Sequence, residues 1–244
     1  MSDAELILAS LKSVDVERAA RDAEYGLRLK VLALKEYQQQ RFRHTYSDLL
    51  VHARYGPASQ FFLEELYGPD DFSLRDSQFA RVIPAMVRLF PKSVVSTVAA
   101  LAELHALSEQ LDTSMGRHLM RIPLDATGYV ETWRATGREL DRTRQIALTL
   151  NVARALDGLT RKPLLWNSLR LMRRPARVAG LGELQLFLER GFERFKAMKG
   201  ADEFIALVEH RERQLASALF GTPQEQTGEI PEAGADLNLL PYLP

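Results

Sequence analysis

The sequence has no cysteine, no excess of charge of either sign and no long uninterrupted hydrophobic run. Without cysteine the chain can form no disulfide framework, no thiolate metal site and no cysteine nucleophile. The 32 basic residues equal the 32 acidic residues in number, so no overall field attracts nucleic acid or an anionic membrane. The most apolar stretch, SVVSTVAALAELHAL at residues 93–107, is shorter than the ~20 residues that a transmembrane helix needs.

Signals for export and for several enzyme classes are missing too. The N-terminal residues acquire charges too early and too often for a secretory signal. The sequence contains no GxSxG nucleophile elbow and no glycine-rich phosphate loop, so nothing in it favours a hydrolase or a nucleotide-dependent enzyme. We therefore expect a cytoplasmic protein with no transmembrane segment, no nucleic acid partner and no cofactor, and the sequence leaves its oligomeric state open.

Apolar residues recur every three or four positions along most of the chain, and strict alternation is nearly absent. This periodicity predicts an all-α, single-domain multi-helix bundle of about seven to nine helices. Residues 1–221 would form the bundle and residues 222–244 a flexible acidic tail, because this segment has four carboxylates and no basic residue. Its apolar end, LNLLPYLP, is either a loosely packed terminus or a docking peptide.

Glycine and proline mark where the helices should begin and end. A long helical region is expected at residues 16–54, with a break near Thr45, and a short helix between Gly56 and Gly68. A helix at residues 74–90 should be kinked or split by Pro84. Further helices are predicted at residues 91–119, 125–159 and 163–174, and a helical hairpin at residues 181–220 that turns at Gly200.

The stretch FFLEELYGPDDF, residues 61–72, places two adjacent carboxylates among aromatic and aliphatic residues. At 100° per residue, Phe61 and Phe62 share a stripe, Glu65 lies between them, and Glu64 points well away. A bare carboxylate aimed at the core would cost several kcal/mol, so Glu65 should be paired, hydrogen-bonded or protonated, whereas Glu64 should be solvated.

Three other polar side chains occupy core positions on their predicted helices. His105 follows the stripe of Val94, Val98 and Leu101, and Arg211 lies near the centre of the stripe of Phe204, Val208, Leu215 and Leu219. Arg144 shares a face with Tyr129, Trp133, Leu140, Ala147 and Asn151. We predict one buried network of Glu65, His105, Arg211 and Arg144. It would either fix the helix register or hold the polar end of a small apolar or anionic ligand.

The spacing of histidines and carboxylates provides a metal alternative. Helical bundles that bind iron typically use Glu-x-x-His pairs, which this sequence lacks. The nearest substitutes are His44, Asp48 and His52, spaced i, i+4, i+8, and the i, i+4 pair of His105 and Glu109. They resemble the ligand spacing of haem-oxygenase-like di-iron proteins, although the helical wheel places only His52 close to an apolar stripe. A haem-oxygenase-like enzyme using iron or haem is therefore the alternative function.

A run of basic residues stands between Asp157 and Glu183 with no carboxylate inside it. On one continuous helix, four of its arginines would be spaced i, i+3, i+4, i+7 and would form a basic ridge, although Pro175 disfavours the last turn. Such a ridge could bind phosphate, anionic lipid or an acidic protein partner, or it could be a solvated face balanced by the acidic tail. The residues of this candidate anion-binding ridge are Arg170, Arg173, Arg174 and Arg177.

The motif FFLEELY at residues 61–67, together with RPARVAGLGELQLFLERGFERFKAM and HRERQLASALF, resembles a family of uncharacterised bacterial proteins named for that motif. The similarity runs over about residues 46–220. The resemblance implies no established activity, cofactor or catalytic residue. The sequence as a whole therefore predicts a non-catalytic binding or interaction protein, for which we name no catalytic residue and no metal ligand.

Overall fold

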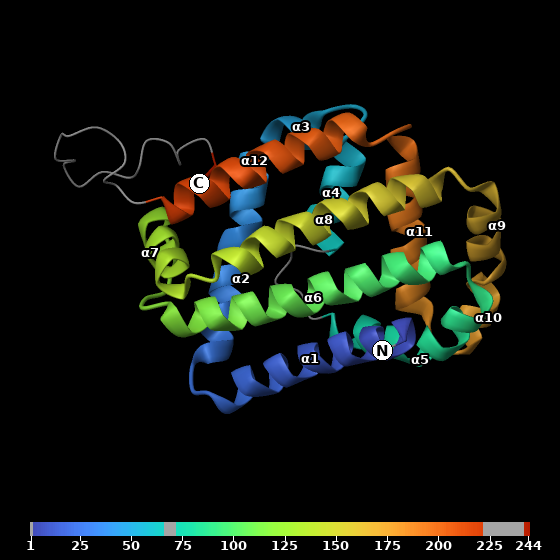
Figure 1. Cartoon of the computed structure of the whole chain (residues 1–244), viewed down its shortest axis with the longest axis horizontal. Helices are drawn as coiled ribbons and strands as arrows, with labels where there is room; N and C mark the ends of the chain where they lie inside the picture. The colour runs from blue at the N-terminus through green and yellow to red at the C-terminus, as the bar shows by residue number, and fades with distance from the viewer. Residues whose placement is uncertain (1, 66–71, 222–241) are drawn as a thin grey trace.

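The computed structural model describes residues 2–65, 72–221 and 242–244. These residues contain twelve helices and no strand, so the all-α prediction is confirmed and the predicted number of helices is too low (Figure 1). The helices are α1 (Asp3–Ala23), α2 (Leu27–Thr45), α3 (Ser47–Val51), α4 (Gly56–Glu65), α5 (Ser73–Leu89), α6 (Lys92–His118), α7 (Ala126–Thr136), α8 (Glu139–Thr160), α9 (Pro163–Leu171), α10 (Arg173–Val178), α11 (Gly182–Ala197) and α12 (Asp202–Phe220).

The additional helices arise at turns that periodicity does not reveal. The predicted helical region at residues 16–54 is interrupted at Gly26, whose φ of 75° lies in the left-handed region that glycine adopts without strain. The predicted helix at residues 125–159 is divided between Gly137 and Arg138, with φ of 63° and 61°. The predicted helix at residues 163–174 is divided at Met172. By contrast, Pro84 lies inside α5 without ending it.

Both ends of the described chain are anchored by hydrogen bonds. At the start, α1 opens with a capping box in which Ser2 and Glu5 satisfy each other's backbone N–H groups, so helix begins well before residue 16. At the other end, Thr45 donates to the carbonyl of Tyr242 at 2.8 Å, and Leu243 is buried in an apolar cluster. Tyr242 and Leu243 therefore dock in cis, whereas residues 222–241, which include the four carboxylates and the first five residues of LNLLPYLP, lie outside the described residues.

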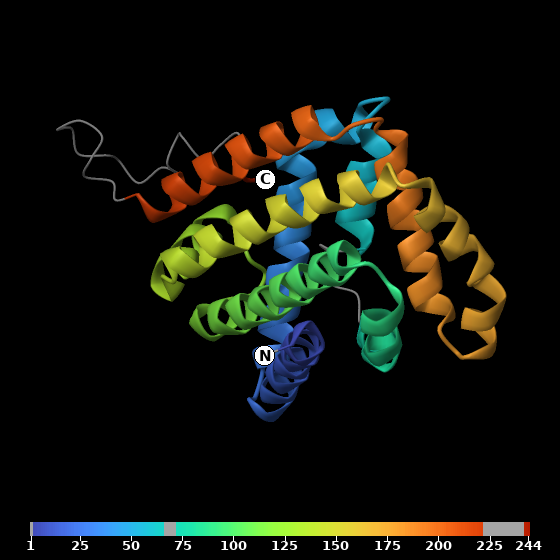
Figure 2. The same ribbon diagram turned by 45° about the vertical axis from the view of Figure 1, so that its right-hand side comes forward.

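Long helices form the body of the molecule. In Figure 1, α6 and α8 run side by side across the middle, with α1 along the outer side of α6 and α12 along the outer side of α8. The helix α2 crosses behind them, and α4 packs on α11. The short helices α9 and α10 lie at one edge, far from Tyr242–Pro244 in both views (Figures 1 and 2). No helix among the described residues is long and apolar enough to span a membrane.

Candidate functional site

The long helices surround an interior cavity of about 240 Å³. Its wall combines aromatic rings with charged groups, and the ring side chains include Phe42, Phe62, Phe72, Phe79, Tyr129, Trp133, Phe187 and Phe204. The charged side chains of the wall are Lys35, Arg41, Arg75, Asp76, Glu109, Asp112, Arg142 and Glu212. The aromatic and aliphatic part of this wall is typical of small-molecule sites, whereas its number of charged groups is high for such a site.

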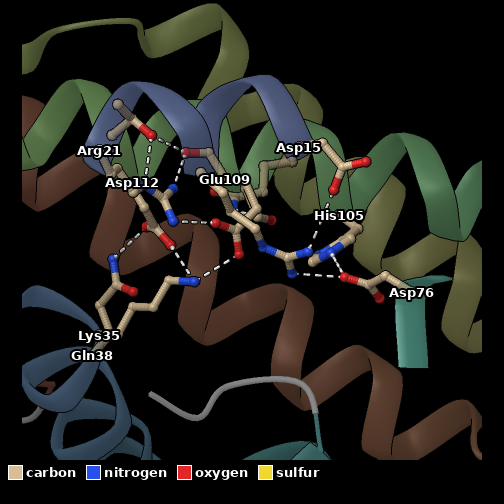
Figure 3. Close-up of polar contacts among 12 residues, drawn as sticks. Asp15, Arg21, Lys35, Gln38, Asp76, His105, Glu109 and Asp112 are labelled. Atoms are coloured by element: carbon tan, nitrogen blue, oxygen red, sulfur yellow. Dashed lines mark hydrogen bonds and ion pairs between the residues drawn. The ribbon is translucent and has the colours of Figure 1, made fainter. Parts of the chain in front are cut away.

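A buried ion triad joins α1, α2 and α6 beside the cavity (Figure 3). The Arg21 guanidinium donates to Glu109 Oε2 at 2.5 Å and to the Glu109 backbone carbonyl at 2.7 Å. The remaining Glu109 oxygen accepts from Lys35 Nζ at 2.6 Å, and Arg21 Nε donates to Thr113 at 2.9 Å. The Arg21 and Glu109 side chains are 8% and 7% exposed, so this pairing takes place almost entirely out of water.

Asp112 lies next to this triad but is less well compensated. Lys35 Nζ is 3.9 Å from its carboxylate, and Gln38 donates to it at 3.1 Å. Burial raises the pKa of Asp112, and the neighbouring Glu109 charge raises it further. Burial also acts against ionised Glu109, but Lys35 and Arg21 outweigh it and lower the pKa of Glu109 to about 2. Glu109 is therefore the fixed anion of the pair, and Asp112 takes up a proton more readily.

His105 forms a second polar group on the wall, one turn of α6 before Glu109. Its Nε2 lies 3.1 Å from Asp76 Oδ2, which also accepts from Arg18 Nη2 at 2.7 Å (Figure 3). Burial raises the pKa of Asp76, but the hydrogen bond and charge of His105, together with Arg18, outweigh burial and hold that pKa below its usual range. Asp76 is thus ionised and bridges α1, α5 and α6.

The end of the cavity near α7 pairs an aromatic ring with an arginine. The Arg142 guanidinium lies 4.0 Å from the centre of the Trp133 ring and donates to Gln145 Oε1 at 3.1 Å. The indole N–H of Trp133 is buried and makes no hydrogen bond within the described part of the chain. A buried donor without an acceptor costs about 1–3 kcal/mol. Trp133 is also one of the residues of the cavity wall.

The sequence-based distinction between the two motif glutamates is confirmed. Glu64 is exposed and accepts a hydrogen bond from Gln60 at 2.6 Å. The Glu65 side chain is only 19% exposed and is paired with Arg190 at 2.9 Å and with Arg75 at 3.6 Å. Glu65 thus has the cationic partners that its inward position requires, but neither is the arginine predicted from the helical wheel.

The four residues of the predicted network do not come together. Arg211, in the middle of α12, donates to both oxygens of Asp48 at 2.7 Å, and only His105 of the four lines the cavity. Arg144 is 63% exposed and pairs with Glu103. Arg144 is exposed because the predicted helix breaks between α7 and α8. This break shifts the helical register, so that the face predicted to continue Tyr129 and Trp133 turns toward solvent.

The charged residues that do meet beside the cavity had a recognisable signal in the sequence. Arg21 lies on the helical face of Ile7, Leu11 and Val14, all of which are buried. Glu109 likewise falls on the buried stripe of α6 that includes Val95, Ala99, Ala102 and Ala106. The same wheel argument that selected His105 and Arg211 would therefore have selected Glu109. It would also have selected Arg21 if the first helix had been predicted to begin at Asp3 rather than near residue 16.

The candidate metal ligands are dispersed. Across residues 2–65, 72–221 and 242–244, no three His, Asp or Glu side chains are grouped so that they could hold a metal ion. Asp48 is engaged by Arg211, and His44 is exposed. His52 follows the end of α3, is exposed and stacks on Tyr55 at 4.5 Å, so the prediction that it lies close to an apolar stripe is wrong.

The predicted basic ridge is not one helical face, because α9 ends at Leu171 and α10 begins at Arg173. Arg173 donates to both oxygens of Glu189, at 2.7 and 2.9 Å, and this hydrogen bond holds the pKa of Glu189 below its usual range. Arg170, Arg174 and Arg177 are exposed. Three of the four arginines therefore remain on the surface of a short helical pair.

These features define an all-α protein with a charged and aromatic interior cavity. The family described as "Domain of unknown function (DUF8198)" matches residues 17–226, and the chain belongs to this family. The match begins within α1 and extends past α12, so it includes every residue of the cavity wall except Leu11. No curated protein and no solved structure matches the chain.

Proposed function

We propose that this protein is a cytoplasmic, non-catalytic binding protein that holds a small, mainly apolar molecule in the interior cavity. The observation that carries the proposal is the cavity itself, with aromatic rings and fixed polar groups in one wall. An engineered apolar cavity of ~150 Å³ accommodates benzene, so in proportion 240 Å³ would accommodate a molecule of about ten non-hydrogen atoms.

The charges of the wall favour a neutral ligand. Lys35 is already shared between Glu109 and Asp112, and Glu212 accepts hydrogen bonds from Arg41 at 2.5 Å and from the Tyr46 hydroxyl at 2.7 Å. A ligand ion would have to disturb these pairs or be buried without a counterion, and each buried ion costs several kcal/mol.

A neutral acceptor has a better place in the cavity. The Trp133 indole N–H would donate to a hydroxyl, ether or carbonyl oxygen, and the rings of Phe62 and Phe204 would contact the apolar part of the ligand. We therefore propose a compact aromatic or alicyclic ligand with one oxygen acceptor. An anionic ligand is the less favourable choice, because it would lie close to Glu109 and Asp76.

Calorimetric titration with 1-naphthol and with naphthalene tests this proposal, because the two probes share their rings and differ by one hydroxyl. We expect both probes to bind the wild-type protein. The Trp133→Phe variant should bind 1-naphthol about fivefold more weakly and naphthalene unchanged, because a fivefold loss corresponds to one hydrogen bond. Trp166→Phe is the matched control, since Trp166 stacks on Phe192 and does not line the cavity.

A second variant tests the location of the probe. Ala153 lines the cavity and is 5% exposed, so Ala153→Leu should fill part of the space and weaken both probes. If neither probe binds to the wild-type protein, or if Ala153→Leu binds both unchanged, the cavity is not a ligand site.

A further inference from the structure

The α9–α10 edge, residues 161–181, projects from the bundle next to α11 (Figure 2). Its inner face is anchored by the stacking of Trp166 on Phe192, with ring centres 5.2 Å apart. On its outer face Leu164 and Leu171 are each 79% exposed, and Val178 at the end of α10 is 91% exposed. Large apolar side chains thus lie in water at this edge of the bundle.

The same edge is locally positive, although the net charge of the whole chain is zero. No carboxylate occurs from residue 158 to residue 182, and Arg170, Arg174 and Arg177 are exposed beside the three apolar side chains. The neighbouring α5 adds Arg81, which donates to the Ala179 carbonyl at 3.0 Å and so places another guanidinium at the end of α10. Within the described ranges, two cations of this edge pair with carboxylates: Arg173 with Glu189 on α11, and Arg161 with Asp157 on α8.

We infer that the α9–α10 edge docks on a membrane surface that contains anionic lipids. Leu164 and Leu171 are seven residues apart on α9, so they point in the same direction, two turns apart, with Asn167 and Ser168 between them on that face. An interfacial helix of this kind inserts its apolar side chains among lipid chains while its arginines contact the phosphate layer.

The pattern fits a bilayer better than an acidic protein or a nucleic acid. The exposed leucines stand on a projecting edge, so they suit insertion into a deformable apolar phase. A polyanion would use the arginines but would leave the leucines in water. Docking at this edge is independent of the proposed cavity ligand, because none of residues 161–181 lines the cavity.

The test is flotation of the full-length protein with vesicles of phosphatidylcholine alone and with vesicles in which half of the lipid is phosphatidylglycerol. We expect binding to the anionic vesicles only, and weaker binding as salt is raised. The triple variant Arg170→Gln, Arg174→Gln, Arg177→Gln should bind about 100-fold more weakly, because each basic side chain near an anionic surface contributes about fivefold. The double variant Leu164→Ser, Leu171→Ser should lose about tenfold.

The matched control removes the same number of positive charges from another part of the surface. It replaces three exposed cations on α1 and α2 in the triple variant Lys12→Gln, Arg28→Gln, Arg43→Gln, which should bind like the wild type. Circular dichroism and urea midpoints establish that each variant is folded. Equal binding by the arginine variant and the control would overturn the inference. The inference would also be overturned if soluble polyglutamate bound the protein as tightly as the anionic vesicles do and if the leucine variant bound the vesicles like the wild type. That result would indicate an acidic protein partner.

Discussion

Replacement of Glu109 by glutamine provides the most direct test of the ion triad. The substitution keeps the size and shape of the side chain but removes the charge that faces both Arg21 at 2.5 Å and Lys35 at 2.6 Å. Breaking a buried pair by neutralising one partner typically costs 3–5 kcal/mol, because the other charge is left uncompensated. Lys35 would still have Asp112 at 3.9 Å, so we expect about 3 kcal/mol at pH 7.

The pH dependence of stability gives a second value for the contribution of Glu109 to the free energy of unfolding. Glu109 has a folded-state pKa of about 2, below the ordinary value of 4.5, so its stabilising effect is complete above the ordinary pKa and is lost as pH falls toward the folded-state pKa. A shift of this size corresponds to roughly 3 kcal/mol, in agreement with the value from pair removal. The difference in stability between wild type and Glu109→Gln should therefore narrow as pH is lowered from 5 to about 3.

Urea unfolding followed by circular dichroism at pH 7, 5, 4 and 3 measures both effects. The matched control is Glu24→Gln, which neutralises a glutamate that pairs with Arg117 at 2.9 Å with both side chains about half exposed. An exposed pair of this kind contributes about 0–1 kcal/mol. Equal losses in the two variants, or a difference between wild type and Glu109→Gln that does not change with pH, would refute the account of the buried triad.

Three further predictions concern packing. Gly116→Ala should destabilise the protein by about 1–3 kcal/mol, because the added Cβ would lie 2.6 Å from Val31 Cγ2 on the facing helix. Gly158→Ala, whose Cβ would meet nothing within 4 Å, should stabilise it by about 0.5 kcal/mol. The urea midpoint should therefore fall in the first variant and rise in the second. Leu243→Ala should lower the free energy of unfolding by about 2 kcal/mol, and Pro244→Ala, at an exposed position, should leave it unchanged. Hydrogen exchange should show Leu243 protected in the wild type and unprotected in Thr45→Val, which removes the hydrogen bond to Tyr242; protection that persists in Thr45→Val would contradict this.

Helical periodicity was sufficient to predict the fold class and several buried faces, since amphipathic helices must turn their apolar side inward. It did not locate the turn at Gly137 and Arg138, both of which have a positive φ, because a glycine inside an apolar helical pattern does not by itself show that the helix ends there. That single turn explains why Leu140 is 86% exposed although it was assigned to a core face. Pairing partners were not predictable either, because Arg21 and Glu109 are 88 residues apart in the chain.

The cavity shows a further limit of periodicity and connects the fold to the proposed function. Val98, Leu101 and His105 form the stripe that was predicted to be core, and all three line the cavity and are only partly buried. A pattern of apolar residues reveals which face of a helix turns inward, but it does not reveal whether that face is filled by neighbours.

The charged groups of the cavity wall help to explain why the space persists. Apolar side chains from α1 and α2 could approach α6 and fill the interior, as close packing generally favours. The pairs of Glu109 with Arg21 and with Lys35 instead fix hydrogen-bond distances between these helices, and collapse would break these pairs. A buried ion triad often contributes less to stability than well-packed hydrophobic residues would in its place. Stability alone therefore does not explain why the triad lies beside a cavity. A need to keep that space open, and polar on one side, explains it better.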